Sequence, residues 1–208
     1  MAFTGTDIKN KALLTLVDDG TRWSDATLVS FINDCFLELI VAAPFANTQV
    51  TTLTLVEGVR QTNDGYLLMD VIANCDSQGV EGETVRKLNA PTLDFTNPTW
   101  KQSKKKATVK FYTMSPDELN AFYIYPPNTG TGYVKIKQSA YITPLTTISG
   151  AINLRNQYIP AIVDYVCYKA YNQDTDSTNQ QIALGYYQNF INKIQMLTGQ
   201  PKPTQNQG

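Results

Sequence analysis

Hydrophobic spacing changes twice along this chain of 208 residues. At both ends apolar residues recur every three or four positions, which is the spacing of one face of an α-helix. Between residues 48 and 142 they alternate with polar residues, as in half-buried β-strands. We therefore predict an α+β fold, in which N-terminal and C-terminal helices form one helical bundle and the inserted block forms an antiparallel β-sandwich or a small barrel.

Capping residues suggest where the N-terminal helices begin and end. Thr6 is expected to cap the first helix and Gly20 to close it, while Ser24 is expected to cap the second helix, which Pro44 ends. Later helices are predicted over residues 158–171 and 179–197. The resulting division is 1–47 for the N-terminal helices, 48–146 for the β-rich insertion, 147–198 for the C-terminal helices and 199–208 for a polar tail.

The inserted block carries several turn signals. Asn63, Asp64 and Gly65 form a typical turn sequence, after which residues 66–72 are predicted to return as a strand. A further strand is expected over residues 121–125, ended by Pro126 and Pro127. Residues 101–106 form the only basic loop, and its Lys104, Lys105 and Lys106 are candidates to face DNA or an acidic partner.

Composition limits the possible chemistry. The formal net charge is -1 and the chain has no histidine, which removes Ser-His-Asp catalysis and imidazole metal sites. The three cysteines are widely spaced, so no disulfide framework is expected. We predict no catalytic residue, no metal, no cofactor and no membrane partner. Two alternatives remain: a peptidoglycan hydrolase using Glu118, and a glycan-binding tail module using strand aromatics such as Tyr123.

Three segments, in this order, resemble the phage adaptor proteins that are also called head-to-tail connectors. They are Arg22-Trp23-Ser24-Asp25-Ala26-Thr27-Leu28 with Phe31-Ile32-Asn33-Asp34, then Phe122-Tyr123-Ile124-Tyr125-Pro126-Pro127, and then residues 158–171. The resemblance covers nearly the whole chain. It implies a structural virion protein and not an enzyme.

The resemblance also implies partners and a location. Such a protein forms a ring, commonly of about twelve copies, between the portal protein and the tail nozzle or tail tube. The ring belongs to the neck of the virion, is assembled in the host cytoplasm, and encloses the channel through which genome DNA passes without sequence recognition.

Candidate contact residues follow from this expectation. The polar tail is predicted to dock onto the portal through Gln200, Pro201, Lys202 and Pro203. Asp34 and Asp164, which lie within predicted helices, are predicted to pair with Arg22 or Arg155 at contacts between copies.

Overall fold

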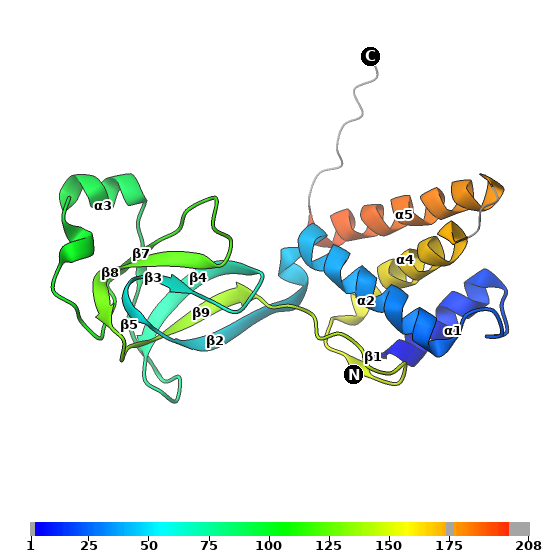
Figure 1. The fold of residues 1–208 in the computed structure, drawn as a ribbon, viewed down its shortest axis with the longest axis horizontal. Coiled ribbons are helices and arrows are strands. Elements are labelled where there is room, and N and C mark those ends of the chain that lie inside the picture. Colours follow the sequence, from blue (N-terminus) through cyan, green and yellow to red (C-terminus); the bar gives the residue numbers. More distant parts are fainter. Residues whose placement is uncertain (1–2, 174–176, 200–208) are drawn as a thin grey trace, which may run out of the picture. The chain divides into compact units, whose positions relative to one another are not determined.

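The computed structural model describes residues 3–173 and 177–199, and this part of the chain is a mixed α+β structure (Figure 1). It divides into two compact units. Residues 48–141 form one of them, here called the β unit. The described residues before Thr48 and after Tyr141 form the other, here called the helical unit.

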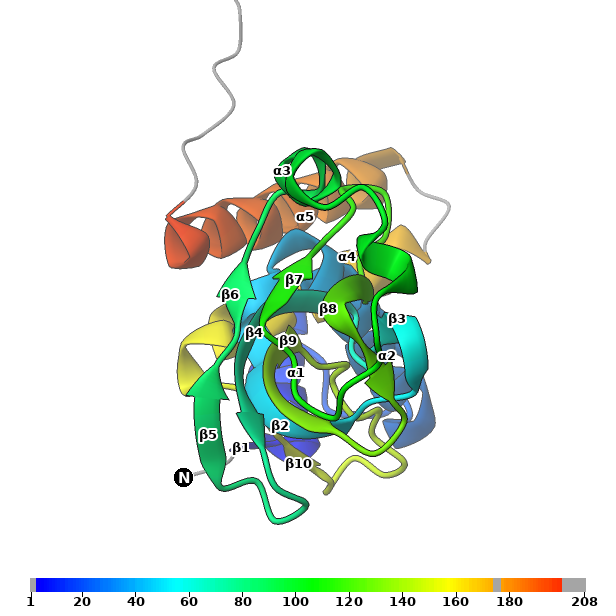
Figure 2. The ribbon, with the colours of Figure 1, turned by 90° about the vertical axis from the view of Figure 1, so that its left-hand side faces the viewer.

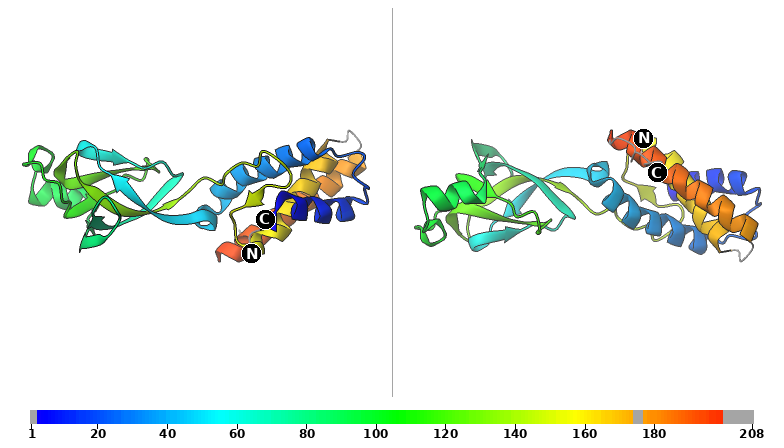
Figure 3. Two further views of the ribbon diagram at one scale, coloured as in Figure 1. Left: turned by 90° about the horizontal axis from the view of Figure 1, so that it is seen from below. Right: turned by 90° about the horizontal axis from the view of Figure 1, so that it is seen from above.

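In the helical unit, α4 is the central element. It contacts α1, α2 and α5, and Figure 3 shows α5 on one side of it and the α1–α2 pair on the other. Eight residues of α4 are buried, so this helix is apolar on most of its circumference. The elements are α1 (Gly5–Leu16), α2 (Asp25–Ala42), η1 (Pro44–Asn47), η3 (Asn156–Tyr158), α4 (Ile159–Asn172), α5 (Ser177–Thr198) and the short strand pair β1 (Phe3–Thr4) and β10 (Ala151–Ile152).

Both predicted ends of α1 are wrong, for local reasons. Thr4, and not Thr6, caps the helix, because Thr4 and Asp7 exchange hydrogen bonds in a capping box: the Thr4 N–H donates to the Asp7 carboxylate at 2.8 Å. At the other end Val17 is the C-cap, in the left-handed conformation that was expected of Gly20. Helix α2 does begin at the predicted cap, since the Ser24 hydroxyl accepts from the Thr27 N–H.

The β unit contains two four-stranded sheets, whose curvature is visible in Figure 2. None of the sheets in the described residues closes into a barrel, so the barrel alternative is wrong. Both sheets contribute to one apolar core that includes Leu68, Phe122 and Val134. The first sheet is β2 (Thr48–Thr54), β9 (Tyr133–Ser139), β4 (Leu67–Cys75) and β5 (Glu81–Thr84); the second is β3 (Glu57–Thr62), β8 (Ala121–Thr129), β7 (Phe111–Thr113) and β6 (Arg86–Lys87).

The turn at residues 63–65 is present, but it does not close a hairpin. It joins β3 and β4, which belong to different sheets. The backbone N–H of Asn63 donates to Asn120 and that of Tyr66 donates to Ser139, so each side of the turn pairs with a different strand. Sequence reasoning missed β3 because its pairing partner, β8, is far away in the sequence.

Strand β8 also continues through Pro126 and Pro127, which were expected to end it. Proline has no N–H to give to a sheet and normally requires a bulge or an edge. The register between β3 and β8 shifts between Gly58 and Arg60, which leaves the prolines outside the regular pairing. The carbonyl of Pro127 still accepts a hydrogen bond from the Lys106 N–H at 2.9 Å.

Candidate functional site

An exposed apolar face runs along two helices of the helical unit. Leu37 and Val41, one turn apart on α2, are 64% and 62% exposed on the side opposite its buried stripe. Leu184 of α5 is 66% exposed and lies one turn before Tyr187, whose hydroxyl donates to the Glu38 carboxylate at 2.7 Å. This hydrogen bond joins α5 to α2. Clustered exposed apolar side chains are typical of protein–protein contact sites.

A second apolar surface lies at the end of α1. Leu14 and Val17 are both largely exposed, and Val17 has a φ of 53°. The left-handed conformation costs an ordinary residue about 1–2 kcal/mol, and a β-branched residue tolerates it poorly. Val17 is 93% exposed. The chain therefore presents a conformationally costly apolar side chain to solvent.

The two predicted contact aspartates already have partners within the chain. Asp34 forms an ion pair with Lys169 at 2.8 Å. The Asp164 carboxylate, which is mostly buried, forms an ion pair with Lys193. Asp34 thus links α2 to α4, and Asp164 links α4 to α5.

The predicted contact arginines lie elsewhere in this unit. The Arg22 guanidinium is 5.0 Å from the centre of the Trp23 ring, a cation–π contact. Arg155 is exposed just before η3. The predicted docking residues, Gln200 to Pro203, lie outside the described residues.

The basic loop belongs to the β unit and is attached to β8 by its backbone. Lys106 donates to the Pro127 carbonyl and accepts from the Thr129 N–H at 3.2 Å. Lys105 forms an ion pair with Glu57, whereas Lys104 and Lys106 are exposed and form no ion pair within the described residues. Residues 86–110 contain seven Lys and Arg residues and a single acid, Asp94, so the positive charge is concentrated here.

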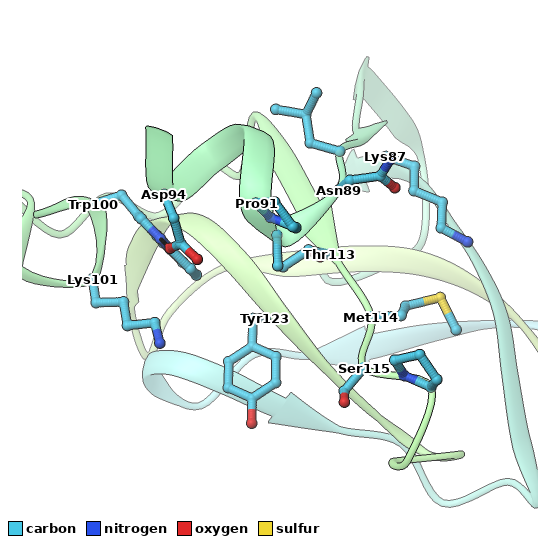
Figure 4. A pocket seen from close by; sticks show the side chains of 13 residues that line it. Lys87, Asn89, Pro91, Asp94, Trp100, Lys101, Thr113, Met114, Ser115 and Tyr123 are labelled. Carbon is cyan, nitrogen blue, oxygen red and sulfur yellow. Dashed lines mark hydrogen bonds between the residues drawn. The ribbon is translucent and has the colours of Figure 1, made fainter. Parts of the chain in front are cut away.

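A groove opens beside this loop. It is bounded by the start of α3 (Ala90–Thr96), by η2 (Trp100–Gln102) and by residues 113–116, with Tyr123 of β8 at one side (Figure 4). The Trp100 indole N–H donates to the Asp94 carboxylate at 2.7 Å. The Lys101 ammonium lies 5.4 Å from the centre of the Trp100 ring and 6.0 Å from that of Tyr123. Sequence reasoning could not find this groove, because four separate segments line it.

Glu118, the residue considered for hydrolysis, is held as a carboxylate. It accepts from Arg60 at 2.9 Å and from the Tyr123 hydroxyl at 3.0 Å. These hydrogen bonds, first the one from Arg60, lower the pKa of Glu118. A general acid needs a raised pKa instead. The arrangement is therefore that of a structural ion pair.

Two features are absent from the described residues. None of the helices combines the length and apolarity needed to cross a bilayer. No group of three or more cysteine and acidic side chains that could hold a metal ion occurs in the described part of the chain.

Comparison with known proteins provides the remaining evidence. No curated protein matches the chain. The model of the SU10 adaptor protein family matches residues 3–207, which is nearly all of it. This match includes all three segments on which the resemblance to phage adaptors rests. The chain therefore belongs to the SU10 adaptor protein family, a family of structural proteins that act as phage head-to-tail adaptors.

Proposed function

We propose that this protein forms a ring of about twelve copies that joins the capsid portal to the tail nozzle or tail tube and lines the channel for genome DNA. Membership of the adaptor family supports the general role. The observation that carries the ring proposal is the apolar face of Leu37, Val41 and Leu184 in the helical unit, together with the separate apolar end of α1. A head-to-tail ring requires two different surfaces on each copy, and this unit presents two.

In this proposal the helical unit is a bundle that forms the ring wall, and the β unit is a sandwich inserted into it as a separate domain. The tail with Gln200, Pro201, Lys202 and Pro203 docks onto the portal. Lys104, Lys105 and Lys106 face DNA or an acidic neighbour, and the ring is assembled in the host cytoplasm. Electron microscopy of the protein mixed with purified portal tests the central claim, because an added ring is expected on the portal. A portal that stays bare would refute it.

The apolar face can be tested with a matched pair of variants. Leu37→Lys with Val41→Lys should abolish ring formation and leave the urea midpoint of the free protein nearly unchanged, because both side chains are already exposed. Val80→Lys, at an equally exposed position of the β unit, is the control and should assemble normally. Normal rings from the double variant would exclude this face from the contact.

The charged contacts form a separate proposal. Asp34 and Asp164 each have one lysine partner, and a carboxylate can accept hydrogen bonds from a second cation. Arg22 or Arg155 of a neighbouring copy would supply that cation. Arg22→Ala should then weaken assembly more than it lowers the stability of the free protein. Unchanged assembly would show that the pairing is wrong.

The tail proposal is tested by truncation after Gly199. The shortened protein should keep its fold and lose affinity for the portal. If it binds the portal as tightly as the full chain does, the docking contacts lie elsewhere.

A further inference from the structure

The groove beside α3 has the size of a binding site for a few side chains. Its volume is about 450 Å³. Pro91, Met114 and Pro116 provide an apolar lining, and Tyr123 forms one wall. In Figure 4 the Thr113 side chain, which lines the groove, lies between those of Pro91 and Tyr123. We call this site the Lys101 groove, after the cation at its side.

Polar groups in the Lys101 groove are available to a ligand. The side chains of Asn89, Thr113 and Ser115 line it, and none of them forms a hydrogen bond within the described residues. Thr113 is only 3% exposed as a residue, so its hydroxyl has little access to bulk water. A hydroxyl with little access to water gains from a hydrogen bond that a ligand supplies.

Lys101 is a cation held in place without a counter-ion. Its ammonium group is in contact with the rings of Trp100 and Tyr123, and it forms no ion pair within the described residues. The nearby acids already have partners: Asp94 accepts from the Trp100 indole, and Glu118 accepts from Arg60 and from the Tyr123 hydroxyl. A charge that is positioned before binding loses less conformational entropy when a carboxylate arrives.

A second lysine strengthens this positive character. Lys87 also lines the groove, is exposed and forms no ion pair in the described part of the chain. Positive charge next to apolar contacts is complementary to an acidic segment that carries an apolar anchor.

We propose that the Lys101 groove binds an acidic peptide segment of a partner protein. The segment inserts an apolar side chain between Pro91, Met114 and Tyr123 and places a carboxylate against Lys101. Nucleic acid fits less well. Single-stranded DNA binds through bases stacked on open aromatic rings, but Trp100 is buried and Lys101 contacts the Tyr123 ring. The proposal concerns the free protein and does not depend on ring formation.

The test measures binding of labelled probes to the full chain by fluorescence anisotropy. One probe is a short peptide in which Glu and Asp flank a single Leu. The others are its neutral Gln and Asn analogue, an acidic peptide without the Leu, and single-stranded and duplex DNA of equal charge. The complete acidic peptide should bind best. Failure of this peptide to bind, or equal binding of the neutral analogue, would overturn the proposal, as would tighter binding of DNA.

Variants then locate the site. Lys101→Gln should weaken binding about fivefold, as expected for one partly exposed charge pair. Ser115→Trp, which fills the groove, should abolish it. Lys137→Gln removes an exposed, unpaired lysine of β9 outside the groove and is the matched control. If Ser115→Trp and Lys101→Gln bind like the control, the peptide binds elsewhere and the proposal is wrong.

Discussion

Asn74 of β4 holds Val109, near the end of the lysine-rich residues 86–110, against the first sheet, and its removal should destabilise the β unit strongly. Its side-chain oxygen accepts from the Val109 N–H at 2.7 Å, and its amide donates to the carbonyls of Val109 at 2.7 Å and Glu83 at 3.1 Å. The register between β4 and β5 shifts between Ala73 and Cys75, at Asn74 itself. The side chain thus provides hydrogen bonds that a neighbouring strand would otherwise supply.

Asn74→Ala removes all three hydrogen bonds and leaves buried backbone groups of Val109 without partners. At roughly 1 kcal/mol for each bond, the loss is about 3 kcal/mol. For a unit of this size, that corresponds to a decrease in melting temperature of about 10–20 °C. Asn74→Asp should be worse, because it keeps the acceptor but sets a negative charge against two carbonyls. Asn120→Ala, at an exposed position, is the control.

Calorimetry measures the stability, and hydrogen exchange reports on the Val109 amide directly. We expect the β unit to melt earlier and this amide to exchange faster in Asn74→Ala. A loss of less than about 1 kcal/mol, or unchanged exchange at Val109, would refute the view that Asn74 replaces a strand in this sheet.

Three other predictions concern the cysteines of both units and two residues of the helical unit. Burial raises the pKa of Cys167 to about 12, so at pH 8 a thiol reagent should modify the partly exposed Cys75 first and reach Cys167 only on unfolding; equal rates would contradict this. The hydrogen bond to Glu38 raises the pKa of Tyr187 to about 12. The stabilisation by this hydrogen bond is therefore complete below pH 10 and is lost as the pH rises towards 12. Tyr187→Phe should flatten this alkaline loss of stability, measured by urea unfolding, and an unchanged loss would refute the role of Tyr187. Val17→Gly should raise the melting temperature of the free protein by relieving about 1 kcal/mol of backbone strain, and a lower value would argue against strain.

The helices could be predicted well because their signals are local. The stripe on α2 and its Ser24 cap lie within one stretch of sequence, and the structure shows both. The start of α1 was predicted wrongly because both Thr4 and Thr6 are good N-cap residues. The capping box between Thr4 and Asp7 selects Thr4, so α1 begins before Thr6. The exposed Leu37 and Val41 do have a sequence signal, since both fall outside the apolar stripe of their helix.

Strand pairing was less predictable because it depends on distant residues. The turn at Asn63 looks like a hairpin turn, but its flanking strands pair with β8 and β9, which follow much later in the chain. The basic loop could be recognised from its lysines alone. The Lys101 groove could not, because Pro91, Trp100, Thr113 and Tyr123 come together only when the second sheet and α3 have formed.

The β unit begins and ends on neighbouring strands, with Thr48 of β2 directly opposite Ser139 of β9. Paired strands are about 5 Å apart, so the two ends of this long insertion are as close as the ends of a tight turn. The insertion therefore restricts the separation of the flanking chain segments about as much as a short loop would. A different inserted unit whose two ends lie equally close would therefore fit between the same helices.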